Sequence, residues 1–446
     1  MTALLIIAVR IARGPLDVRL KKRCAGPITA AAFAVVVYLA WDWLSPDGIG
    51  TPYFVGEFSG VLAMYLMTWA LLLATRVRWL EQWFGGLDRM YFWHKQYALC
   101  AMLLFAPHIL LTELGTAPRA VHEDPHLVGL GHLLGAVSGI GLLALVGISL
   151  ARVGRILHLP YERWLLLHRL TGLLVLSALV HGWFLDPVTS GSAVLRILYV
   201  AVGAIGTAAY CYDELVMRRR APRADYIVRT VERPAPDVLD VTLSPAGTTS
   251  LPVKGGQFIY LRVGNRPWRE HPFSIAGTQP DGSVRLTVRA LGRGTQRLYT
   301  DLREGLPATL DGPYGMFDHT VGGTRQIWIA GGIGIAPFLG WINSPSPAAL
   351  PHADLFYCTP TPSEAPFLPD LAALAHRNSA LRVHPVYSRS QGRIDVEKIQ
   401  AAAGPLTPET HVFLCGPMGL ISKLTHDLRR HGVPRSHVHA EHFAFR

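Results

Sequence analysis

Four histidines in two matched pairs are the residues of this chain with the clearest chemical meaning. His94 and His108 are fourteen residues apart, His168 and His181 are thirteen apart, and each pair lies in a stretch hydrophobic enough to cross a membrane. An imidazole inside lipid is costly, so a functional or paired role is the default expectation. Either interval separates its two rings by roughly 20 Å along a helix, within a hydrocarbon core about 30 Å thick.

Neutral imidazole is an axial ligand of haem iron, and two imidazoles per iron leave an electron-transfer centre without an open position for oxygen. One histidine from each helix per iron would hold two haems stacked across the bilayer. The alternative is that each histidine makes one hydrogen bond within a helix bundle. That alternative suits a single histidine better than a matched set of four.

The two intervals are not equally suited to one helix face. Fourteen residues at about 100° each fall roughly 40° short of four full turns, so His94 and His108 share a face, whereas thirteen residues miss by roughly 140°. The helix that carries the second pair must therefore tighten, bend or approach its haems edgewise. Gly172 and Gly182 offer places for that.

Half of the 446 residues are hydrophobic, and the apolar excess is confined to the first half of the chain. Six stretches are candidate membrane spans, namely residues 27–44, 55–75, 91–112, 128–150, 164–185 and 193–213. From residue 221 onward, the composition predicts a soluble region. The opening run of residues 3–12 is too short to span and lacks a signal-peptide cleavage site, so we expect an interfacial helix there.

Basic residues gather in alternate loops between these spans, and the opposite loops are mainly acidic. The basic loops precede the first span, join the second to the third and the fourth to the fifth, and follow the sixth. The positive-inside rule then predicts cytoplasmic termini and a multi-pass protein of the inner (plasma) membrane. The third and fifth spans both run outward, which pairs His94 with His168 at the inner level and His108 with His181 at the outer level. Nucleic-acid binding is not needed to explain the net charge of +11.

The residues around the histidines favour haem that is not covalently attached. The five cysteines form no CxxC or CxxCH pattern, so neither a zinc site nor c-type attachment is indicated, and we expect b-type haems. Lys95 and Arg169 each follow an inner histidine. They are suited equally to pairing with haem propionates and to reaching lipid phosphate.

After the last span, short alternating strands punctuated by glycine predict a small antiparallel barrel, with strands at residues 225–233, 238–243, 258–263 and 284–289. Three segments in this region could do chemistry: His271 to Ile275, which is expected to end a strand, Gly292-Arg293-Gly294-Thr295, which opens a helix, and Gly312-Pro313-Tyr314-Gly315, which makes a turn. Backbone amides at a glycine-led helix start suit a pyrophosphate. A plain helix cap explains Gly294 and Thr295 equally well.

The last third alternates strand and helix, which predicts a doubly wound parallel sheet with strands at residues 326–330, 354–357, 381–387 and 411–414. The first strand ends in Gly331-Gly332-Ile333-Gly334-Ile335-Ala336-Pro337, where glycines let the backbone approach a dinucleotide phosphate. The last strand runs into Cys415-Gly416-Pro417, at the edge where such sheets bind ligands. An ordinary strand-to-helix connection is the alternative for such a turn taken alone.

Taken in this order, the motifs resemble the NADPH oxidase and ferric reductase family over nearly all of the chain beyond about residue 25. Members of that family join a six-helix, two-haem transmembrane domain to a ferredoxin-NADP reductase-like module. The histidine pairs match the family spacing, His271 to Ser274 match its HPF(S/T) flavin motif, and Cys415 to Pro417 match its CGP motif. The resemblance implies four regions: a cytoplasmic N-terminal segment (1–26), a transmembrane domain (27–217), an FAD-binding barrel (222–320) and an NAD(P)H-binding domain (324–446).

The resemblance also implies roles for individual residues. The four paired histidines would be the haem ligands, and Cys415 and Phe443 would be the catalytic residues, with Phe443 covering the flavin ring. The cofactor-binding residues would be His271, Pro272, Phe273, Ser274, Arg289, Gly294, Thr295, Gly331, Gly332, Gly334, Pro337, Ser388, Arg389, Arg393, Gly416 and Pro417.

Two of these assignments carry alternatives. Glu441-His442-Phe443 matches the family ending in which an aromatic ring covers the flavin, but the chain continues for three residues, which include Phe445, so it is open which phenylalanine stacks, and a disordered terminus is the alternative. Ser388-Arg389, with Arg393 nearby, matches a pair that binds the adenosine 2′-phosphate of NADPH. A solvated basic loop, compatible with NADH, is the alternative there.

The implied activity is electron transfer from cytoplasmic NAD(P)H through FAD and two b-type haems to an external small molecule. The acceptor is oxygen, reduced to superoxide, or a ferric chelate. The eukaryotic oxidases have a further histidine where this chain has Thr112, which departs from their oxygen site. A rival hypothesis is an electron-transfer subunit that reduces a periplasmic partner or a quinone. Apart from membrane lipid, no obligatory partner is indicated.

Overall fold

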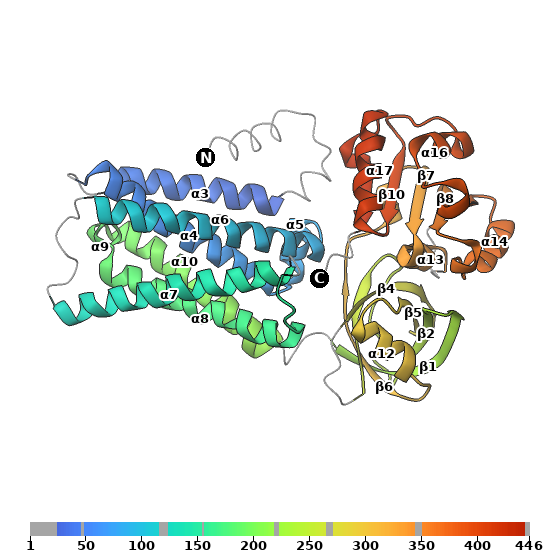
Figure 1. Cartoon of the computed structure of the whole chain (residues 1–446), viewed down its shortest axis with the longest axis horizontal. Coiled ribbons are helices and arrows are strands. Elements are labelled where there is room, and N and C mark those ends of the chain that lie inside the picture. The colour runs from blue at the N-terminus through green and yellow to red at the C-terminus, as the bar shows by residue number, and fades with distance from the viewer. Residues whose placement is uncertain are drawn as a thin grey trace. The chain divides into compact units, whose positions relative to one another are not determined.

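The structure is a computed structural model that describes residues 25–45, 49–115, 124–153, 156–217, 223–264, 271–343 and 350–441. The chain divides into two compact units, which meet in sequence at Arg219 and Arg220 (Figure 1). The predicted interfacial helix at residues 3–12 and the flavin-covering Phe443 lie outside the described residues.

The first unit is a bundle of long apolar helices. Its six candidate spans are α3 (Ala25–Leu44), α4 (Thr51–Ala74), α6 (Leu87–Leu114), α7 (Pro125–Val153), α8 (Tyr161–Leu185) and α10 (Ala193–Cys211). Each is long and apolar enough to cross a membrane. All six predicted spans are therefore confirmed as helices. Shorter elements connect or extend them: α5 (Arg78–Phe84), α9 (Pro187–Gly191) and the π-helical turn η1 (Tyr212–Met217).

An apolar cluster from four of these helices fills the middle of the bundle. Its buried members are Ala63, Met64 and Met67 of α4, Ala101 of α6, Leu142 of α7 and Val175 of α8. Ala101 and Val175 each stand about midway in sequence between the two histidines of their helix. The cluster therefore separates the two histidine levels.

The glycines that were expected to bend α8 have a different role. A Cβ atom at Gly172 would overlap the ring of Tyr210, and one at Gly182 would overlap the Tyr199 hydroxyl. Both glycines thus admit a tyrosine of α10, which is the small-residue packing common between membrane helices. α8 is one uninterrupted helix, whereas α6 contains Pro107, and a proline inside a helix removes a backbone bond and favours a bend.

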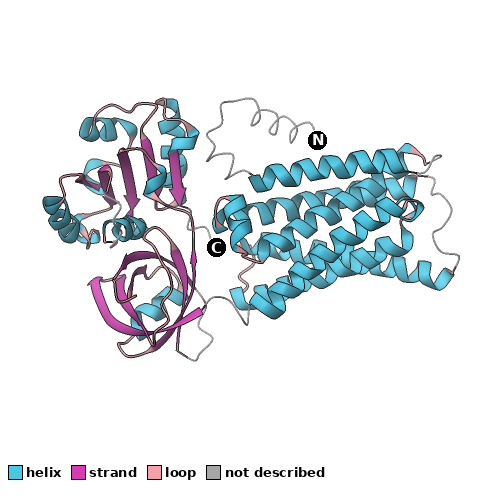
Figure 2. Ribbon diagram, turned by 180° about the vertical axis from the view of Figure 1, so that it is seen from behind, coloured by secondary structure: helices cyan, strands magenta, loops and turns pink. Residues whose placement is uncertain are grey.

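The second unit begins with a closed antiparallel barrel (Figure 2). Its strands are β1 (Arg223–Ala235), β2 (Val238–Pro245), β3 (Phe258–Val263), β4 (His271–Thr278), β5 (Val284–Arg289) and β6 (Pro307–Tyr314), in the order β1-β2-β5-β4-β3-β6. The barrel prediction is confirmed. α12 (Arg293–Asp301) follows β5.

Two details of the barrel correct the expectations from sequence. The segment from His271 begins β4 and does not end a strand, because the chain stays extended through Ala276, Gly277 and Thr278. The segment Gly312-Pro313-Tyr314 belongs to β6 and is not a turn. The register shifts between Phe258 and Tyr260 of β3, where β6 has one residue more than β3, and β6 stays paired past its glycine and proline.

The chain ends in a five-stranded parallel sheet of order β11-β10-β7-β8-β9. The strands are β7 (Arg325–Gly331), β8 (His352–Thr359), β9 (Leu381–Tyr387), β10 (His411–Cys415) and β11 (Val438–Glu441). They alternate with α13 (Ala336–Ile342), α14 (Leu368–Arg377), α15 (Ser388–Gln391), α16 (Val396–Ala403) and α17 (Met418–Arg430). The four predicted strands are confirmed, and β11 is an addition to them.

The barrel and the sheet share one hydrophobic core. Ala235, Val238 and Ala276 of the barrel pack in the same buried cluster as Trp328 and Phe338 of the nucleotide-binding fold. A Cβ atom at Gly340 of α13 would overlap the carbonyl oxygen of Ile275, so α13 rests directly on β4. This close packing fixes the carboxyl edge of the sheet relative to the barrel.

Candidate functional site

The structure brings the paired histidines together as the sequence predicted. The ring centroids of His94 and His168 are 6.0 Å apart, and those of His108 and His181 are 6.2 Å apart. A metal ion held about 2.0 Å from one nitrogen of each ring would separate two imidazole centroids by roughly 6 Å. Each pair therefore has the spacing that a bis-imidazole iron centre requires.

Hydrogen bonds fix the orientation of these rings. The Nδ1 atoms of His94, His108 and His181 lie 2.7, 3.0 and 2.9 Å from the carbonyl oxygens of Ala70, Gly56 and Gly131. A carbonyl oxygen only accepts, so in these three rings Nδ1 carries the proton and donates. The Nε2 lone pair is then the one available to iron, which is the tautomer that a haem ligand needs.

Two glycines give the rings of His108 and His181 room. A Cβ atom at Gly60 of α4 would lie 2.7 Å from Nδ1 of His108, and one at Gly135 of α7 would lie 2.6 Å from Nδ1 of His181. Each glycine follows the residue that accepts the imidazole bond by one helical turn. His108 and His181 are thus held by equivalent glycine pairs on α4 and α7, and any larger residue would fill the space that these glycines leave.

The donor set fits a porphyrin better than a bare metal ion. Within the described residues, no group of three or more His, Cys, Asp or Glu side chains is placed to hold a metal by itself. Two imidazoles per site match haem, whose porphyrin supplies the other four nitrogens. Of the two basic residues beside the inner histidines, Lys95 is exposed, and Arg169 has its Nε atom 3.9 Å from a carboxylate oxygen of Glu214.

The flavin motif leaves one buried hydroxyl without a partner. Ser274 on β4 is 4% exposed, and its Oγ atom forms no hydrogen bond within the described part of the chain. An unbonded buried hydroxyl is costly unless a ligand satisfies it. Beside it, His271 packs against the start of α12, where a Cβ atom at Gly294 would overlap the imidazole. These residues fit a polar ring system such as that of flavin.

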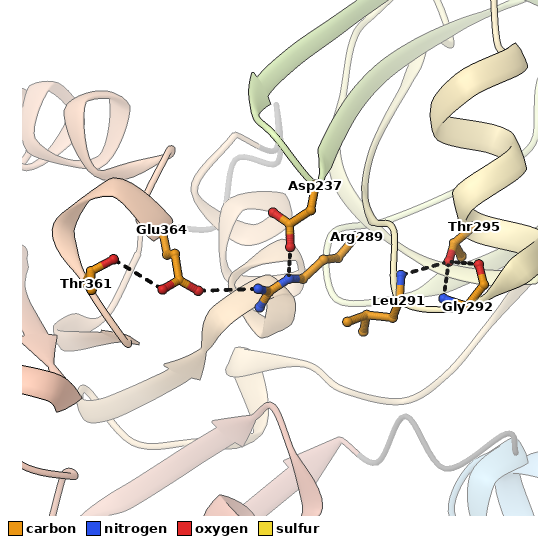
Figure 3. A network of polar contacts seen from close by, with 7 residues as sticks. All are labelled: Asp237, Arg289, Leu291, Gly292, Thr295, Thr361 and Glu364. Atoms are coloured by element: carbon orange, nitrogen blue, oxygen red, sulfur yellow. Dashed lines mark hydrogen bonds and ion pairs between the residues drawn. The ribbon is translucent and has the colours of Figure 1, made fainter.

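The start of α12 is organised by Thr295 (Figure 3). Its hydroxyl oxygen accepts the backbone N–H groups of Leu291 and Gly292, each at 3.0 Å, and donates to the carbonyl of Gly292 at 3.1 Å. Thr295 therefore caps the start of the helix, which is one of the two interpretations that the sequence allowed. The pyrophosphate reading of the same loop remains a prediction.

Two glycine-containing turns meet at the carboxyl edge of the sheet. Gly331 is the last residue of β7 and opens the turn that runs to Pro337, and Cys415 is the last residue of the neighbouring β10 and opens the turn that runs to Pro417. A Cβ atom at Gly331 would lie 2.8 Å from a ring carbon of Pro417, so the two turns touch. Gly332 has a φ of +56°, a conformation that favours glycine. Neighbouring turns at this edge form the place where doubly wound sheets bind dinucleotides.

Cys415 is buried beside a carboxylate. Its sulfur lies 3.9 Å from a carboxylate oxygen of Glu441, at the end of β11. Burial raises the pKa of the Cys415 thiol well above its ordinary value, and the charge of Glu441 raises it further. At neutral pH the group is therefore a thiol, which can donate a hydrogen bond but does not act as a nucleophile.

Arg289 links the barrel to the nucleotide-binding fold (Figure 3). Its Nε atom is 2.6 Å from a carboxylate oxygen of Asp237, and its Nη2 atom is 3.4 Å from one of Glu364. Thr361 donates to the other oxygen of Glu364 at 3.2 Å. Arg289 also lies near the glycine turn, since a Cβ atom at Gly332 would be 3.5 Å from its Nη1 atom. It thus presents a guanidinium at the dinucleotide edge.

The remaining basic candidates lie at the end of β9. Ser388 and Arg389 begin α15, and the side chains of Arg389 and Arg393 are exposed. The backbone N–H of Arg389 donates to the carbonyl of Pro360, which follows β8. Ser388 and Arg389 therefore stand on the same carboxyl edge as the glycine turns. The guanidinium groups of Arg389 and Arg393 are exposed to solvent.

Sequence reasoning missed the residues that hold the predicted ones in place. Ala70, Gly56 and Gly131 accept the imidazole bonds through backbone carbonyls, which no residue type reveals. Asp237 and Glu364 are ordinary acidic residues in sequence. One pattern in the sequence could have indicated these positions: a GxxxG motif occurs at Gly56 and Gly60 and again at Gly131 and Gly135.

Three protein families match successive parts of the chain. Residues 59–179 match the family described as ferric reductase like transmembrane component, residues 226–318 match an FAD-binding domain, and residues 328–426 match an oxidoreductase NAD-binding domain. The first match includes three of the paired histidines and ends two residues before the fourth.

The chain has the domain architecture of the NADPH oxidase and ferric reductase family.

This ferric reductase-like chain therefore joins a multi-pass membrane domain to an FAD-binding domain and an oxidoreductase NAD-binding domain. The reductase subunit of carnitine monooxygenase from Escherichia coli (strain K12) is 30% identical over 166 residues, which are 36% of this chain and 48% of that protein. Ferredoxin–NADP reductase B from Sorangium cellulosum (strain So ce56) is 27% identical over 232 residues, which are 47% of this chain and 93% of that protein. The chain spans about half the length of the first of these relatives.

Two solved structures are similar at low identity. A flavohemoglobin from Malassezia yamatoensis with bound FAD and heme has a TM-score of 0.49 at 16% identity, over 92% of this chain and 97% of that one. A ferredoxin NADP+ reductase from Neisseria gonorrhoeae with bound FAD and NADP has a TM-score of 0.43 at 21% identity, over 50% of this chain and 99% of that one.

Proposed function

We propose that this ferric reductase-like chain is an NADPH oxidase that carries electrons from cytoplasmic NADPH across the membrane to external oxygen, giving superoxide. Its carriers are FAD and two b-type haems. The observation that supports this most strongly is the pair of imidazole pairs, 6.0 and 6.2 Å between centroids, at two levels of one bundle. Two such centres give a one-electron path through a hydrocarbon core about 30 Å thick.

When bound, FAD accepts two electrons from NADPH and releases them singly, and haem carries one electron at a time. The protein supplies position and insulation. His94, His108 and His181 orient their Nε2 lone pairs through bonds from Nδ1, and the apolar cluster around Ala101 and Val175 keeps water and polar groups from the space between the two levels.

In the second unit, three polar groups are assigned to the flavin and the nicotinamide: the hydroxyl of Ser274, the thiol of Cys415 and the carboxylate of Glu441. The thiol stays protonated, so it donates a hydrogen bond, and Glu441 offers an acceptor. Gly331, Gly332 and Gly334 would admit the dinucleotide phosphates, with Arg289 as the nearby cation.

NADPH is favoured over NADH because two exposed arginines, Arg389 and Arg393, stand at the end of β9 beside Ser388. Guanidinium groups suit a 2′-phosphate, which NADH lacks. Removing the Arg389 side chain should raise the KM for NADPH and leave the KM for NADH unchanged.

We place this activity in the inner membrane with both termini in the cytoplasm, on the basis of the loop charges. The acceptor then meets the outer centre at His108 and His181, on the opposite side from the reductase. His108 and His181 would together hold the haem there, which would supply one-electron transfer to oxygen and offer it no open binding position.

A ferric chelate is the second candidate acceptor, and Thr112 favours it. The Thr112 hydroxyl donates to the carbonyl of His108, in its own helix, at 2.6 Å. The hydroxyl proton of Thr112 is therefore committed to the backbone of its own helix and is not available to oxygen. A chelate needs only an accessible outer haem edge.

The experiment is NADPH-driven reduction of cytochrome c in air by purified protein loaded with FAD, with and without superoxide dismutase. Strong inhibition by the dismutase supports the oxidase. Activity that the dismutase leaves unchanged, together with anaerobic reduction of ferric chelates, would assign a metal reductase. Failure with both acceptors would assign an electron-transfer subunit for a protein or quinone.

A further inference from the structure

One of the four imidazoles is held differently from the others. Three donate from Nδ1 to a backbone carbonyl at 2.7 to 3.0 Å. His168, on α8 at the inner level, has instead the hydroxyl of Ser149 on α7 as its Nδ1 neighbour, at 3.4 Å. This contact is longer than an ordinary hydrogen bond, and a hydroxyl is a weaker acceptor than an amide carbonyl.

The proton of Ser149 is already committed. Its hydroxyl donates to the carbonyl of Leu145 at 2.8 Å and accepts the indole N–H of Trp164 at 2.9 Å. A hydroxyl has one proton and two lone pairs, so the remaining lone pair faces His168. His168 must therefore be the donor in this contact, with Nε2 left for iron as in the other three rings.

Trp164 contacts the same imidazole a second time. Its indole stacks on the His168 ring at 4.9 Å between centroids, with 19° between the planes. The guanidinium carbon of Arg152 lies over the same indole, 4.9 Å from its ring centre. Trp164 thus orients the ring by stacking and limits the accepting power of Ser149 by donating to the same oxygen.

We propose that Ser149 and Trp164 are positioning residues that set the reduction potential of the inner haem through His168. This inference rests on the proposed haem ligation. A hydrogen bond from Nδ1 raises the basicity of an imidazole ligand, and a more basic ligand stabilises ferric iron and lowers its potential. Because two donors share the Ser149 oxygen, each bond to it is weakened, and the inner haem receives one ordinary and one weakly supported ligand.

Variants of the two residues should move the potential in opposite directions. Ser149→Ala removes the acceptor, so the inner potential should rise. Trp164→Phe keeps an aromatic ring on the imidazole but removes the competing N–H, so Ser149 accepts more strongly and the inner potential should fall. Ser149→Thr retains a hydroxyl and should restore the wild-type value. A role in packing alone would shift both variants the same way or cost haem in both.

The test is an optical redox titration of the purified full chain, repeated in a His108→Leu background so that the inner haem is titrated alone. The low-spin EPR signal of that haem, which depends on the imidazole plane, is a second readout. Ser138→Ala is the matched control, because Ser138 lies on α7 and donates to the carbonyl of Gly135 in its own helix. It should leave the inner potential unchanged.

Opposite shifts with an unchanged control support the inference. Haem present in normal amount with unchanged inner potentials in both variants, or with shifts of the same sign, would overturn it. Wild-type protein that binds no haem would instead overturn the proposed function, so the two failures are distinguishable.

Discussion

The orientation and tautomer of the paired histidines are set by atoms outside their own side chains. A carbonyl oxygen at Nδ1 fixes the tautomer of His94, His108 and His181, and that choice leaves Nε2 for iron. The residue type supplies an imidazole, and the neighbouring helix orients it for the ligand role that we propose. Assigning a ligand from its identity alone would therefore miss half of the arrangement.

Replacing His181 by Leu should remove about half of the haem. The outer centre would lose one axial ligand, while the His94–His168 pair, 6.0 Å between centroids, stays intact. Haem content per chain, measured as the pyridine haemochrome, checks this, and the flavin should still oxidise NADPH slowly. His132→Leu, on the same outer side, is a control that should keep both haems. Retention of two haems in the His181 variant would remove it from the ligand set.

Ser274→Ala should weaken FAD binding by about tenfold, which corresponds to the roughly 1.4 kcal/mol of one hydrogen bond. The thermal stability of the apoprotein should not fall, because the Ser274 hydroxyl has no partner to lose within the described residues. Flavin fluorescence titration and melting of the flavin-free protein are the two measurements. Ser283→Ala is the contrast, since its hydroxyl is bonded to Ser244. Unchanged FAD affinity would show that Ser274 does not face the flavin.

The helices position the outer histidines through close glycine contacts. α4 supplies Gly56 and Gly60 to His108, and α7 supplies Gly131 and Gly135 to His181. In each case the first glycine offers its carbonyl and the second leaves space for the ring. The proposed outer centre therefore depends on two helices that carry none of the four proposed ligands.

Gly135→Ala should lower occupancy of the outer haem by displacing His181. The added Cβ atom would lie 2.6 Å from Nδ1, a contact that costs about 1–3 kcal/mol to relieve. Gly139→Ala is a matched control on the same helix, because a Cβ atom there would meet nothing within 4 Å. Haem content and the His181-dependent absorbance should fall in the first variant only. Equal haem in both variants would contradict this role of Gly135.

Strands β8 and β9 are joined by a buried carboxylate. Asp354, 2% exposed, accepts from Arg382 at 2.7 Å and from His384 at 2.8 Å. Burial by itself would raise the pKa of Asp354, but the bonds from His384 and Arg382 outweigh it and hold the pKa below its ordinary value. The carboxylate therefore stabilises the fold above about pH 4, the pKa of an unfolded aspartate, and this contribution is lost as pH falls through the lower folded value.

Asp354→Asn should destabilise the nucleotide-binding fold by about 1–2 kcal/mol at pH 7. The difference in stability between the variant and the wild type should narrow as the pH is lowered past about 4, because the wild-type carboxylate then loses its charge and becomes neutral like the amide of the variant. Thermal release of FAD, followed by its fluorescence in detergent, measures both. A difference that is the same at pH 7 and below pH 4 would show that charge is not the cause.

Long, regular elements were predictable from sequence, and short or irregular ones were not. The six spans were visible because apolar runs of this length have few other structures. β11 was missed because its four residues, Val438–Glu441, include a histidine and a glutamate and pair with β10 only through the fold. The strand at Gly312-Pro313-Tyr314 was read as a turn because glycine and proline usually end strands.

The site followed the same division. The histidine pairs could be assigned from spacing because two helices of known direction fix their levels. Ser149, Asp237 and Glu364 could not, since each acts through a partner that lies 19 to 75 residues away in sequence and is brought close only by tertiary packing. Such residues have no local pattern, so only the folded chain identifies them.

The whole molecule joins a membrane bundle with two imidazole pairs to a reductase with flavin and dinucleotide motifs on one polypeptide. Neither unit alone accounts for the other. A bundle without an electron source has no use for two centres at different depths, and a reductase needs no membrane to reduce a soluble acceptor. Their combination is the reason to expect electron flow across the bilayer.

The most direct test of this account is anaerobic addition of NADPH to the purified, FAD-loaded protein while the haem bands are recorded. We expect two haems per chain, and reduction of both without any added mediator. Protein without haem, or haem that stays oxidised while the flavin is reduced, would contradict the central claim.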